Sequence, residues 1–517
     1  AAGKVRYTLF ILLVCSCSTV PPTQLQYTPY TPEETWRTSS PAQQGLDTAY
    51  IDGLIHTIRT RKIDVHNLTV IKNGHCVAQV DFAPYSGESL HDIASCTKSV
   101  MAVLTGIAID KGYIHSEEAT VADIIRDRRI ADNPAFRELQ IRHLLSMSSG
   151  LECINTVSDE HPFAETTLLE MMHSDNWYAY IAAMDRTDTP GKRFDYFSIN
   201  FHLLSMLIRD ASGMPAVEFA RIHLFEPLGI TEYAWAADPH GNSYGWGNLM
   251  LKPLDLARIG YLVKNRGRWG GRQVVSQHWI DEMLTEKVSG GWNPVFHMDY
   301  GYGFFLPSGI RNGFYAGLGR GGQYLFIFPK EDMVIVTLGN FNNTDFFLGL
   351  TDVDTTQTRD RAGSSGPVRR TVPYSTEIPS RNGAGLDAWH ALSGRWVPRG
   401  EDVLGIEYVE FLPGDGSVYI HVESNVLSVA GYASMDGAAY THDRGGIAGT
   451  VITSARSTDD GLEIVMNEIE NINTFHITVS GLENLQDRGS VEVMLYEHLL
   501  LPRGYTFRMK KEHTDGD

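Results

Sequence analysis

The sequence places β-prone segments at both ends of a long helical stretch, and this order limits the folds open to the chain. Residues 69–80 form two β-prone runs around Asn73-Gly74, a pair typical of a tight hairpin. Residues 117–230 are mainly helical in pattern. Three β-prone runs return later, at 304–306, 324–329 and 333–338. We therefore expect an α/β fold, in which an antiparallel sheet flanked by helices is completed by late strands, with a mainly helical subdomain and a functional site between the two parts.

A second stretch of β pattern follows a linker. Residues 351–386 carry Thr, Ser, Gly, Pro and Arg with almost no apolar period, which is typical of a linker. Beyond it, apolar and polar residues alternate in runs separated by Gly, Asp and Asn, which predicts a C-terminal all-β barrel or sandwich domain. The expected units are a signal segment, a tether, the α/β domain, a linker and the β-rich domain, at 1–17, 18–44, 45–350, 351–386 and 387–517.

The first residues have the pattern of a bacterial export signal. Two basic residues precede an apolar block at 7–14 that is too short to span a bilayer. Val14-Cys15-Ser16-Cys17 resembles the cleavage box of lipoproteins, with Cys17 as the lipidated residue and Cys15 as an unusual occupant. The Pro-, Thr- and Ser-rich residues that follow favour a tether. We expect an exported, periplasmic protein attached to the outer membrane by an N-terminal lipid.

Charge and cysteine usage exclude several classes of protein. The formal net charge of -19 is the reverse of what phosphate binding needs, so no nucleic-acid partner is expected. Cleavage at Cys17 would leave Cys76, Cys96 and Cys153, which is no disulfide framework. The histidines show no metal-ligand spacing, so neither a metal nor another cofactor is expected.

A single Ser-x-x-Lys pattern occurs, at Ser95 and Lys98, and it opens an apolar segment with helical spacing that runs to Gly112. Ser and Lys three residues apart share a helix face, so the amine can act as a base for the hydroxyl if burial lowers its pKa. The amides at the helix start would stabilise an oxyanion. The alternative is structural, with Ser95 capping the helix and Lys98 solvated.

Five further segments follow Ser95 and Lys98 in order, at 107–112, 141–151, 190–200, 251–260 and 319–323. Together they resemble the serine β-lactamase and penicillin-binding protein superfamily, and more closely its branch of class C-like esterases and 6-aminohexanoate-dimer hydrolases. The resemblance covers roughly 45–350 and is far more specific than any single motif. It implies a β-lactamase/transpeptidase-like fold.

The resemblance also implies roles for individual residues. Ser95 corresponds to the acylated nucleophile, Lys98 to its partner, and Tyr196 to the tyrosine that shuttles a proton between serine, lysine and leaving group. A neighbouring ammonium is expected to bring the pKa of Tyr196 toward neutrality. Whether Lys98 or Tyr196 first accepts the serine proton is open. The backbone amides of Ser95 and Gly322 correspond to the oxyanion hole.

Two motifs depart from the β-lactamase pattern. On the expected edge strand, Gly319-Arg320-Gly321 replaces Lys or His, then Thr or Ser, then Gly, so Arg320 either takes the place of the missing cation or faces away. The second motif reads Tyr196-x-Ser198-x-Asn200, which moves the carboxamide that β-lactamases use and disfavours β-lactam turnover. Further candidates for substrate binding are the aromatic residues Trp177, Tyr178, Tyr244 and Trp246, although aromatic residues more often belong to a core.

A rival motif, Gly241-x-Ser243-x-Gly245, fits the nucleophile elbow of α/β-hydrolases, but its neighbours match neither the strand nor the helix that an elbow needs. We therefore interpret it as a loop. The predicted function is hydrolysis of ester or small amide bonds through a Ser95 acyl-enzyme, with Lys98 and Tyr196 as general base and acid and a small ester or amide as partner. The alternatives are a D-amino-acid peptidase or weak β-lactamase, and a catalytically silent lipoprotein that binds the cell wall.

Overall fold

The computed structural model describes residues 36–82, 85–158, 161–292, 297–307, 313–341, 343–353 and 366–372, together with ten strands between 394 and 511. The signal segment, the lipidation site at Cys17 and most of the expected tether lie outside the described residues. Within the described part, no helix combines the length and the apolar character that crossing a membrane requires.

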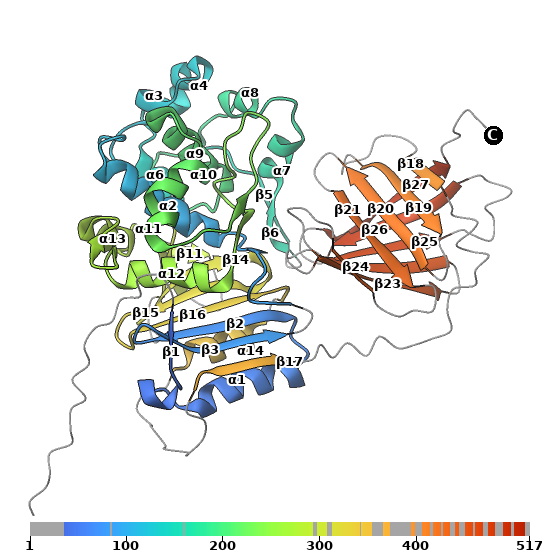
Figure 1. Ribbon diagram of the computed structural model, residues 1–517. Coiled ribbons are helices and arrows are strands. Elements are labelled where there is room, and N and C mark those ends of the chain that lie inside the picture. The colour runs from blue at the N-terminus through green and yellow to red at the C-terminus, as the bar shows by residue number, and fades with distance from the viewer. Residues whose placement is uncertain are drawn as a thin grey trace, which may run out of the picture.

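The predicted hairpin forms and joins the late strands in one sheet (Figure 1). β2 (Val65–Lys72) and β3 (His75–Phe82) pair around Asn73 and Gly74, which both have positive φ. On its other side, β2 pairs antiparallel with β16 (Met333–Gly339). The strand order is β1-β3-β2-β16-β15-β14-β13-β12-β11. The other strands on this path are β1 (Arg37–Thr38), β11 (Val288–Trp292), β12 (His297–Tyr300), β13 (Phe305–Pro307), β14 (Tyr315–Gly319) and β15 (Gln323–Phe328). The expectation that late strands complete the sheet is confirmed.

One edge of the sheet differs from the expected antiparallel arrangement. β1 and β17 (Val368–Val372) both pair with β3 in parallel, so the sheet is mixed. β17 lies inside the segment that we expected to be a linker, and Val368 is buried. Because both strands are short, neither shows an apolar period that sequence analysis can detect.

Helices cover both faces of the sheet (Figure 1). α1 (Thr48–Thr60) packs with α14 (Thr344–Thr351) on one face, and α12 (Pro253–Lys264) lies on β2, β15 and β16 on the other. The predicted helical subdomain consists mainly of α3 (Val121–Ile124), α4 (Arg128–Asp132), α5 (Pro134–Arg137), α6 (Ile141–Leu145), α7 (Thr166–His173), α8 (Trp177–Ala182), α9 (Ser198–Ser212), α10 (Ala216–Ala220) and α11 (Glu226–Leu228). α13 (Gln277–Met283) packs against the helix that follows Ser95.

That helix, α2 (Cys96–Asp110), lies between the sheet and the helical subdomain and is buried from Cys96 to Ala108. It is buried on all sides because it packs against the sheet, α9 and α13. Gly112 follows it with φ of 75°, as predicted for the stop. Close packing against the sheet depends on glycine: a Cβ on Gly317 would lie 2.8 Å from Ser99 Oγ, and the Ser99 hydroxyl donates to the carbonyl oxygen of Gly303 at 2.6 Å.

The C-terminal strands pair antiparallel in one sheet of order β21-β20-β19-β18-β27-β26-β25-β24-β23-β22. They are β18 (Gly394–Pro398), β19 (Ile406–Pro413), β20 (Ser417–Ser424), β21 (Ser428–Ser434), β22 (Tyr440–Asp443), β23 (Thr450–Thr458), β24 (Gly461–Glu468), β25 (Thr474–Ser480), β26 (Ser490–Glu497) and β27 (Leu501–Lys511). An all-β barrel or sandwich domain over residues 387–517 stays a prediction.

Candidate active site

Ser95 stands at the start of α2, immediately before its first residue. It is the one residue between His91 and Val100 that is not buried. Its side chain makes no capping hydrogen bond to the helix, so the alternative role of Ser95 as a helix cap is excluded. The preceding Ala94 has φ of 45°, a left-handed conformation that costs energy for a residue with a Cβ. The backbone therefore turns sharply just before Ser95, which is partly exposed.

Lys98 lies one turn into α2 with its amine directed at Ser95. Its Nζ is 2.9 Å from Ser95 Oγ and 3.0 Å from the carbonyl oxygen of Trp246. Lys98 is only 2% exposed, so the solvated lysine of the structural alternative is excluded. Burial lowers the pKa of Lys98 to about 8, although the carboxyl group of Glu165 opposes the shift. About a tenth of Lys98 is therefore a neutral amine at pH 7, far more than for an ordinary exposed lysine.

Tyr196 comes from the loop before α9 and completes the group around Ser95. A side-chain hydrogen bond joins it to Ser95, and Lys98 Nζ lies 4.9 Å from the centre of its ring. The ring stacks on Phe305 of β13 at 6.4 Å between centroids. Burial, supported by the charge of Glu165, raises the pKa of Tyr196 above its ordinary value, and the hydrogen bond with Ser95 only partly opposes this. The expected shift toward neutrality is therefore wrong in direction.

Glu165 is a fourth ionisable group at this place, and sequence analysis missed it. It ends β6 (His161–Glu165), and its Oε1 accepts from the backbone N–H of Ser198 at 3.0 Å. Although the residue is partly exposed, protein atoms surround its carboxyl end, and burial raises its pKa while Lys98 and Ser198 oppose the shift. No motif contains Glu165, so no sequence signal could have identified it.

The third motif forms a turn and not a strand, contrary to expectation. β14 ends at Gly319, Arg320–Gly322 make a 3-10 turn in which Gly321 and Gly322 have φ of 74° and 82°, and β15 begins at Gln323. Two consecutive left-handed residues end regular strand pairing, and glycine adopts them without strain. A Cβ on Gly322 would lie 2.2 Å from the ring of Phe341, so the position admits no side chain without rearrangement. The Gln323 side chain fixes the turn by donating to the carbonyl oxygens of Arg320 and Gly339.

The second-motif candidates Ser198 and Asn200 occupy different surroundings. Ser198 hydrogen-bonds Glu165 through both its backbone and its side chain. Asn200 is 0% exposed, and its amide contacts the sulfur of Met147 at 3.7 Å. The structure therefore brings Ser198 to the group around Ser95 and leaves Asn200 in the interior.

Three of the four aromatic candidates pack on one another, and the backbone of one of them, Trp246, contacts Lys98. Tyr244 stacks on Trp246 with centroids 4.6 Å apart, and Trp177 lies 5.3 Å from Tyr244 and 5.8 Å from Trp246. Trp177 and Trp246 are buried. This arrangement favours the core interpretation for these rings, and a contribution to an acyl pocket stays a prediction.

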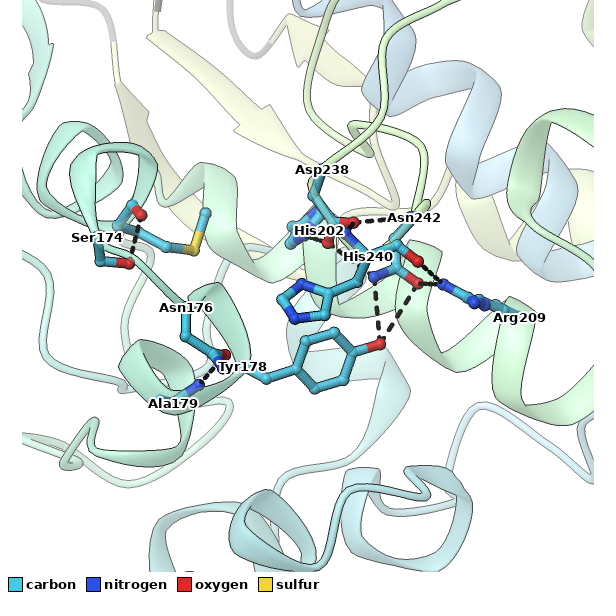
Figure 2. Close-up of polar contacts among 10 residues, drawn as sticks. Ser174, Asn176, Tyr178, Ala179, His202, Arg209, Asp238, His240 and Asn242 are labelled. Atoms are coloured by element: carbon cyan, nitrogen blue, oxygen red, sulfur yellow. Dashed lines mark hydrogen bonds and ion pairs between the residues drawn. The ribbon is translucent and has the colours of Figure 1, made fainter. Parts of the chain in front are cut away.

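A polar network centred on Asp238 holds the loop that carries Tyr244 and Trp246 (Figure 2). Asp238 accepts from His202 Nε2 at 3.1 Å, from Asn242 Nδ2 at 2.7 Å and from two backbone N–H groups. Figure 2 shows Tyr178, the fourth aromatic candidate, pointing at the amide of Asn242, and Arg209 reaches the same amide at 3.1 Å. Sequence analysis did not detect this network, because its members are spread over three segments.

The rival Gly241-x-Ser243-x-Gly245 motif lies in this loop, as predicted. Ser243 is 0% exposed and its Oγ accepts from the backbone N–H of Val217 at 3.1 Å. A substrate cannot reach this hydroxyl in the observed conformation.

The cysteine next to Ser95, the possible metal ligands and the one described pocket add no group to the site. Cys96 is buried, its Sγ contacts the carbonyl oxygens of Gly317 and Gln323, and burial raises the pKa of its thiol, in agreement with a packing role. Among the described residues, no group of three His, Cys, Asp or Glu side chains is placed to hold a metal ion. A small pocket beside His66, Tyr85 and His91 is lined by none of the residues Ser95, Lys98 and Tyr196.

Comparison with known proteins identifies the class. The family model described as Beta-lactamase matches residues 52–354. The chain is 24% identical over 293 residues to the 6-aminohexanoate-dimer hydrolase of Paenarthrobacter ureafaciens, covering 53% of this chain and 72% of that protein. It is 24% identical over 268 residues to penicillin-binding protein 4* of Bacillus subtilis (strain 168), covering 44% of this chain and 55% of that protein. A family VIII carboxylesterase of known structure is similar over 59% of this chain and 96% of that chain, with 17% identity and a TM-score of 0.49.

The match over residues 52–354 places this chain in the β-lactamase family. Within the serine β-lactamase and penicillin-binding protein superfamily, it belongs to the branch that includes the 6-aminohexanoate-dimer hydrolases, and it is a serine hydrolase.

Proposed function

We propose that the protein hydrolyses carboxylic esters or small amides through an acyl-enzyme on Ser95. One observation carries the proposal: the buried amine of Lys98 lies 2.9 Å from Ser95 Oγ, and Tyr196 hydrogen-bonds the same hydroxyl. A weakly acidic alcohol becomes a nucleophile when a base of suitable pKa is within hydrogen-bond reach.

In the acylation step, Ser95 Oγ attacks the substrate carbonyl carbon and its proton passes to the neutral amine of Lys98. The raised pKa of Tyr196 keeps its phenol protonated, which favours Lys98 over Tyr196 as first proton acceptor. The backbone amides of Ser95 and Gly322 would stabilise the oxyanion that forms. When the carbon–oxygen or carbon–nitrogen bond breaks, the leaving group takes a proton from Tyr196, which recovers one from Lys98.

Deacylation reverses the proton path with water in place of the leaving group. Water attacks the acyl carbon and gives up a proton to the base, and Ser95 Oγ leaves as a hydroxyl. No step requires a metal or a cofactor. Glu165 would balance the positive charge that develops on Lys98, because the two groups interact electrostatically.

The substrate class follows from the two departures from the β-lactamase pattern. Asn200 is buried against Met147, so its carboxamide is not placed to bind an acylamino group of a β-lactam. The related 6-aminohexanoate-dimer hydrolase carries a name that fits the hydrolysis of small amides. These observations favour esters and small amides over β-lactams and D-amino-acid peptides. A panel of p-nitrophenyl esters, amide oligomers and nitrocefin ranks these classes.

A fluorophosphonate probe tests the nucleophile. The probe should label Ser95, and Ser95→Ala should abolish both labelling and p-nitrophenyl acetate hydrolysis. Ser243→Ala is the matched control, since it removes the serine of the rival motif and should leave labelling and hydrolysis intact. Labelling that survives Ser95→Ala, or that disappears in Ser243→Ala, would refute the proposal.

A further inference from the structure

Asp92 is a buried carboxylate three residues before the nucleophile, and the mechanism above assigns it no role. It ends β4 (His91–Asp92), which pairs with β8 (Leu249–Leu251). Asp92 is 4% exposed, and burial raises the pKa of its carboxyl to about 6. An enclosed carboxylate is costly unless hydrogen bonds and a counter-charge compensate it, so its partners indicate what it does.

The hydrogen-bond partners of Asp92 are two backbone amides in strained conformations. Its Oδ1 accepts from the N–H of Ala94 at 2.8 Å, and the carboxyl group also accepts from the N–H of Asn248. Ala94 and Asn248 have φ of 45° and 55°, both in the left-handed region that side chains other than glycine adopt only when their surroundings hold them. One carboxylate thus holds two strained turns.

Each of these turns positions a group of the active site. Ala94 directly precedes Ser95, so its conformation sets where the hydroxyl points. Asn248 lies two residues beyond Trp246, whose carbonyl oxygen accepts from Lys98 Nζ at 3.0 Å. The two turns lie close together, since a Cβ on Gly247 would lie 3.9 Å from the carbonyl of Ala94.

The counter-charge of Asp92 comes from the third motif. The positive charge of Arg320 lowers the pKa of Asp92, opposing the effect of burial. The same turn approaches the nucleophile closely, because a Cβ on Gly319 would lie 2.9 Å from the carbonyl oxygen of Ile93 and 3.1 Å from Ala94 Cβ. An unneutralised carboxylate here would repel the oxyanion that forms on the substrate.

We propose that Asp92 is a positioning residue that fixes the backbone before Ser95 and behind Lys98, and that Arg320 neutralises Asp92 instead of binding a substrate carboxylate. The proposal rests on the assignment of Ser95 as nucleophile. The sequence left open whether Arg320 replaces the missing cation or faces away, and the proposal gives it a different role, in the internal electrostatics of the site.

The test measures kcat and KM for neutral p-nitrophenyl acetate in Asp92→Asn, Arg320→Gln and the double variant. Asp92→Asn keeps the shape but loses one acceptor oxygen and the charge that strengthens the hydrogen bonds from Ala94 and Asn248. The weaker positioning should lower kcat about tenfold or more, while KM changes less than about threefold. Arg320→Gln should lower kcat for this neutral ester too. The double variant should lose less than the product of the two single losses, because the residues act on each other.

Asp81→Asn is the matched control. Asp81, like Asp92, is a carboxylate that accepts a hydrogen bond, in this case from the Asn67 side chain at 2.6 Å, but it lies on β3 away from Ser95. It should leave kcat unchanged. A folded Asp92→Asn protein with kcat within twofold of wild type, or a loss carried by KM, would overturn the role of Asp92. If thermal melting shows that Asp92→Asn is unfolded at the assay temperature, Arg320→Gln alone decides. A loss of activity confined to esters that bear a carboxylate would overturn the proposal. A loss of activity on the neutral ester would support it.

Ser95→Ala in the same assay separates this proposal from the proposed function. If Ser95→Ala is inactive and Asp92→Asn is fully active, only the positioning role is wrong. If Ser95→Ala keeps wild-type activity, the proposed function itself is wrong, and the positioning role that rests on it is wrong as well.

Discussion

Lys98 Nζ lies 3.0 Å from the carbonyl oxygen of Trp246, and this contact determines how the amine can meet Ser95. A neutral amine has two N–H groups and one lone pair. When one N–H donates to the fixed carbonyl oxygen, the lone pair can face Ser95 Oγ at 2.9 Å. The loop at Trp246 therefore orients the base, and burial lowers its pKa.

Lys98→Arg should strongly reduce hydrolysis although it keeps the positive charge. A guanidinium does not lose its proton in a protein, so it cannot accept the proton of Ser95. We expect kcat/KM for p-nitrophenyl acetate to fall about 10²-fold or more. Lys264→Arg is the control, because Lys264 is also largely buried but pairs with Asp332 at 2.5 Å, away from Ser95. Activity of Lys98→Arg within tenfold of wild type would contradict the role of Lys98 as base.

The pH dependence of acylation should follow the neutral form of Lys98. Burial lowers its pKa from 10.5 to about 8, so the base is protonated below that pH and free above it. The value of kcat/KM for a neutral ester should rise with pH up to about 8 and then level off. Stopped-flow or steady-state rates between pH 6 and 9 test this, and a flat profile over that range would exclude Lys98 as the titrating base.

Tyr196→Phe should slow turnover because it removes the proton carrier between Lys98 and the leaving group. We expect a loss of about 10²-fold in kcat, as for other general acid–base groups. Tyr50→Phe is a suitable control, because this substitution also removes one hydrogen bond of a tyrosine hydroxyl. That hydroxyl donates to the Leu350 carbonyl oxygen at 2.8 Å, on the far face of the sheet. A near-normal rate in Tyr196→Phe would show that another group protonates the leaving group.

Sequence analysis predicted the elements that local pattern controls. The Asn73-Gly74 hairpin, the apolar helix after Ser95 and its stop at Gly112 depend on residues close in the chain. Ser95, Lys98 and Tyr196 were identified because their motifs occur together, and the structure brings them into contact.

What sequence analysis missed depends on contacts between distant segments. Glu165 reaches the site because it ends β6 next to Ser198, with which it forms a hydrogen bond. Its charge helps to raise the pKa of Tyr196, which is opposite to the expected direction. The resemblance placed Arg320 and Gly321 on an edge strand, but Arg320–Gly322 form a turn, and Phe341 packs against Gly322 there. Neither feature leaves a periodic signal in the sequence.

Asp238→Ala should destabilise the protein and lower activity together. Asp238 and His202 have fully buried side chains, and removal of one partner of such a pair typically costs about 3–5 kcal/mol. The loop bearing Trp246 would lose its support, so kcat should fall as well. Urea unfolding of Asp238→Ala and the milder Asp238→Asn measures the first effect, and equal stability of Asp238→Ala and wild type would disprove it.

The same network predicts a loss of stability in acid. Burial alone would raise the pKa of Asp238, but hydrogen bonds from His202 and Asn242 outweigh it and lower the pKa from 3.8 to about 2. The folded state therefore holds this carboxylate ionised more strongly than the unfolded state does. Its contribution to stability is complete above about pH 4 and is lost as the pH falls toward 2. The acid dependence of unfolding between pH 5 and 2 should be shallower in Asp238→Asn than in wild type.

Gly303→Ala should disturb the active site through the backbone of α2. Gly303 has φ of 69°, and a Cβ there would lie 2.8 Å from the carbonyl oxygen of Lys98 and 2.9 Å from Ala102 Cβ. The helix must shift at Lys98 to make room, so stability should fall by about 2–4 kcal/mol and kcat should fall with it. Gly112→Ala isolates the conformational part of this cost, because Gly112 has φ of 75° and open space around the missing Cβ. It should lose only about 1 kcal/mol and keep its activity. Equal effects of the two variants in urea unfolding and ester hydrolysis would show that close packing at Gly303 does not position Lys98.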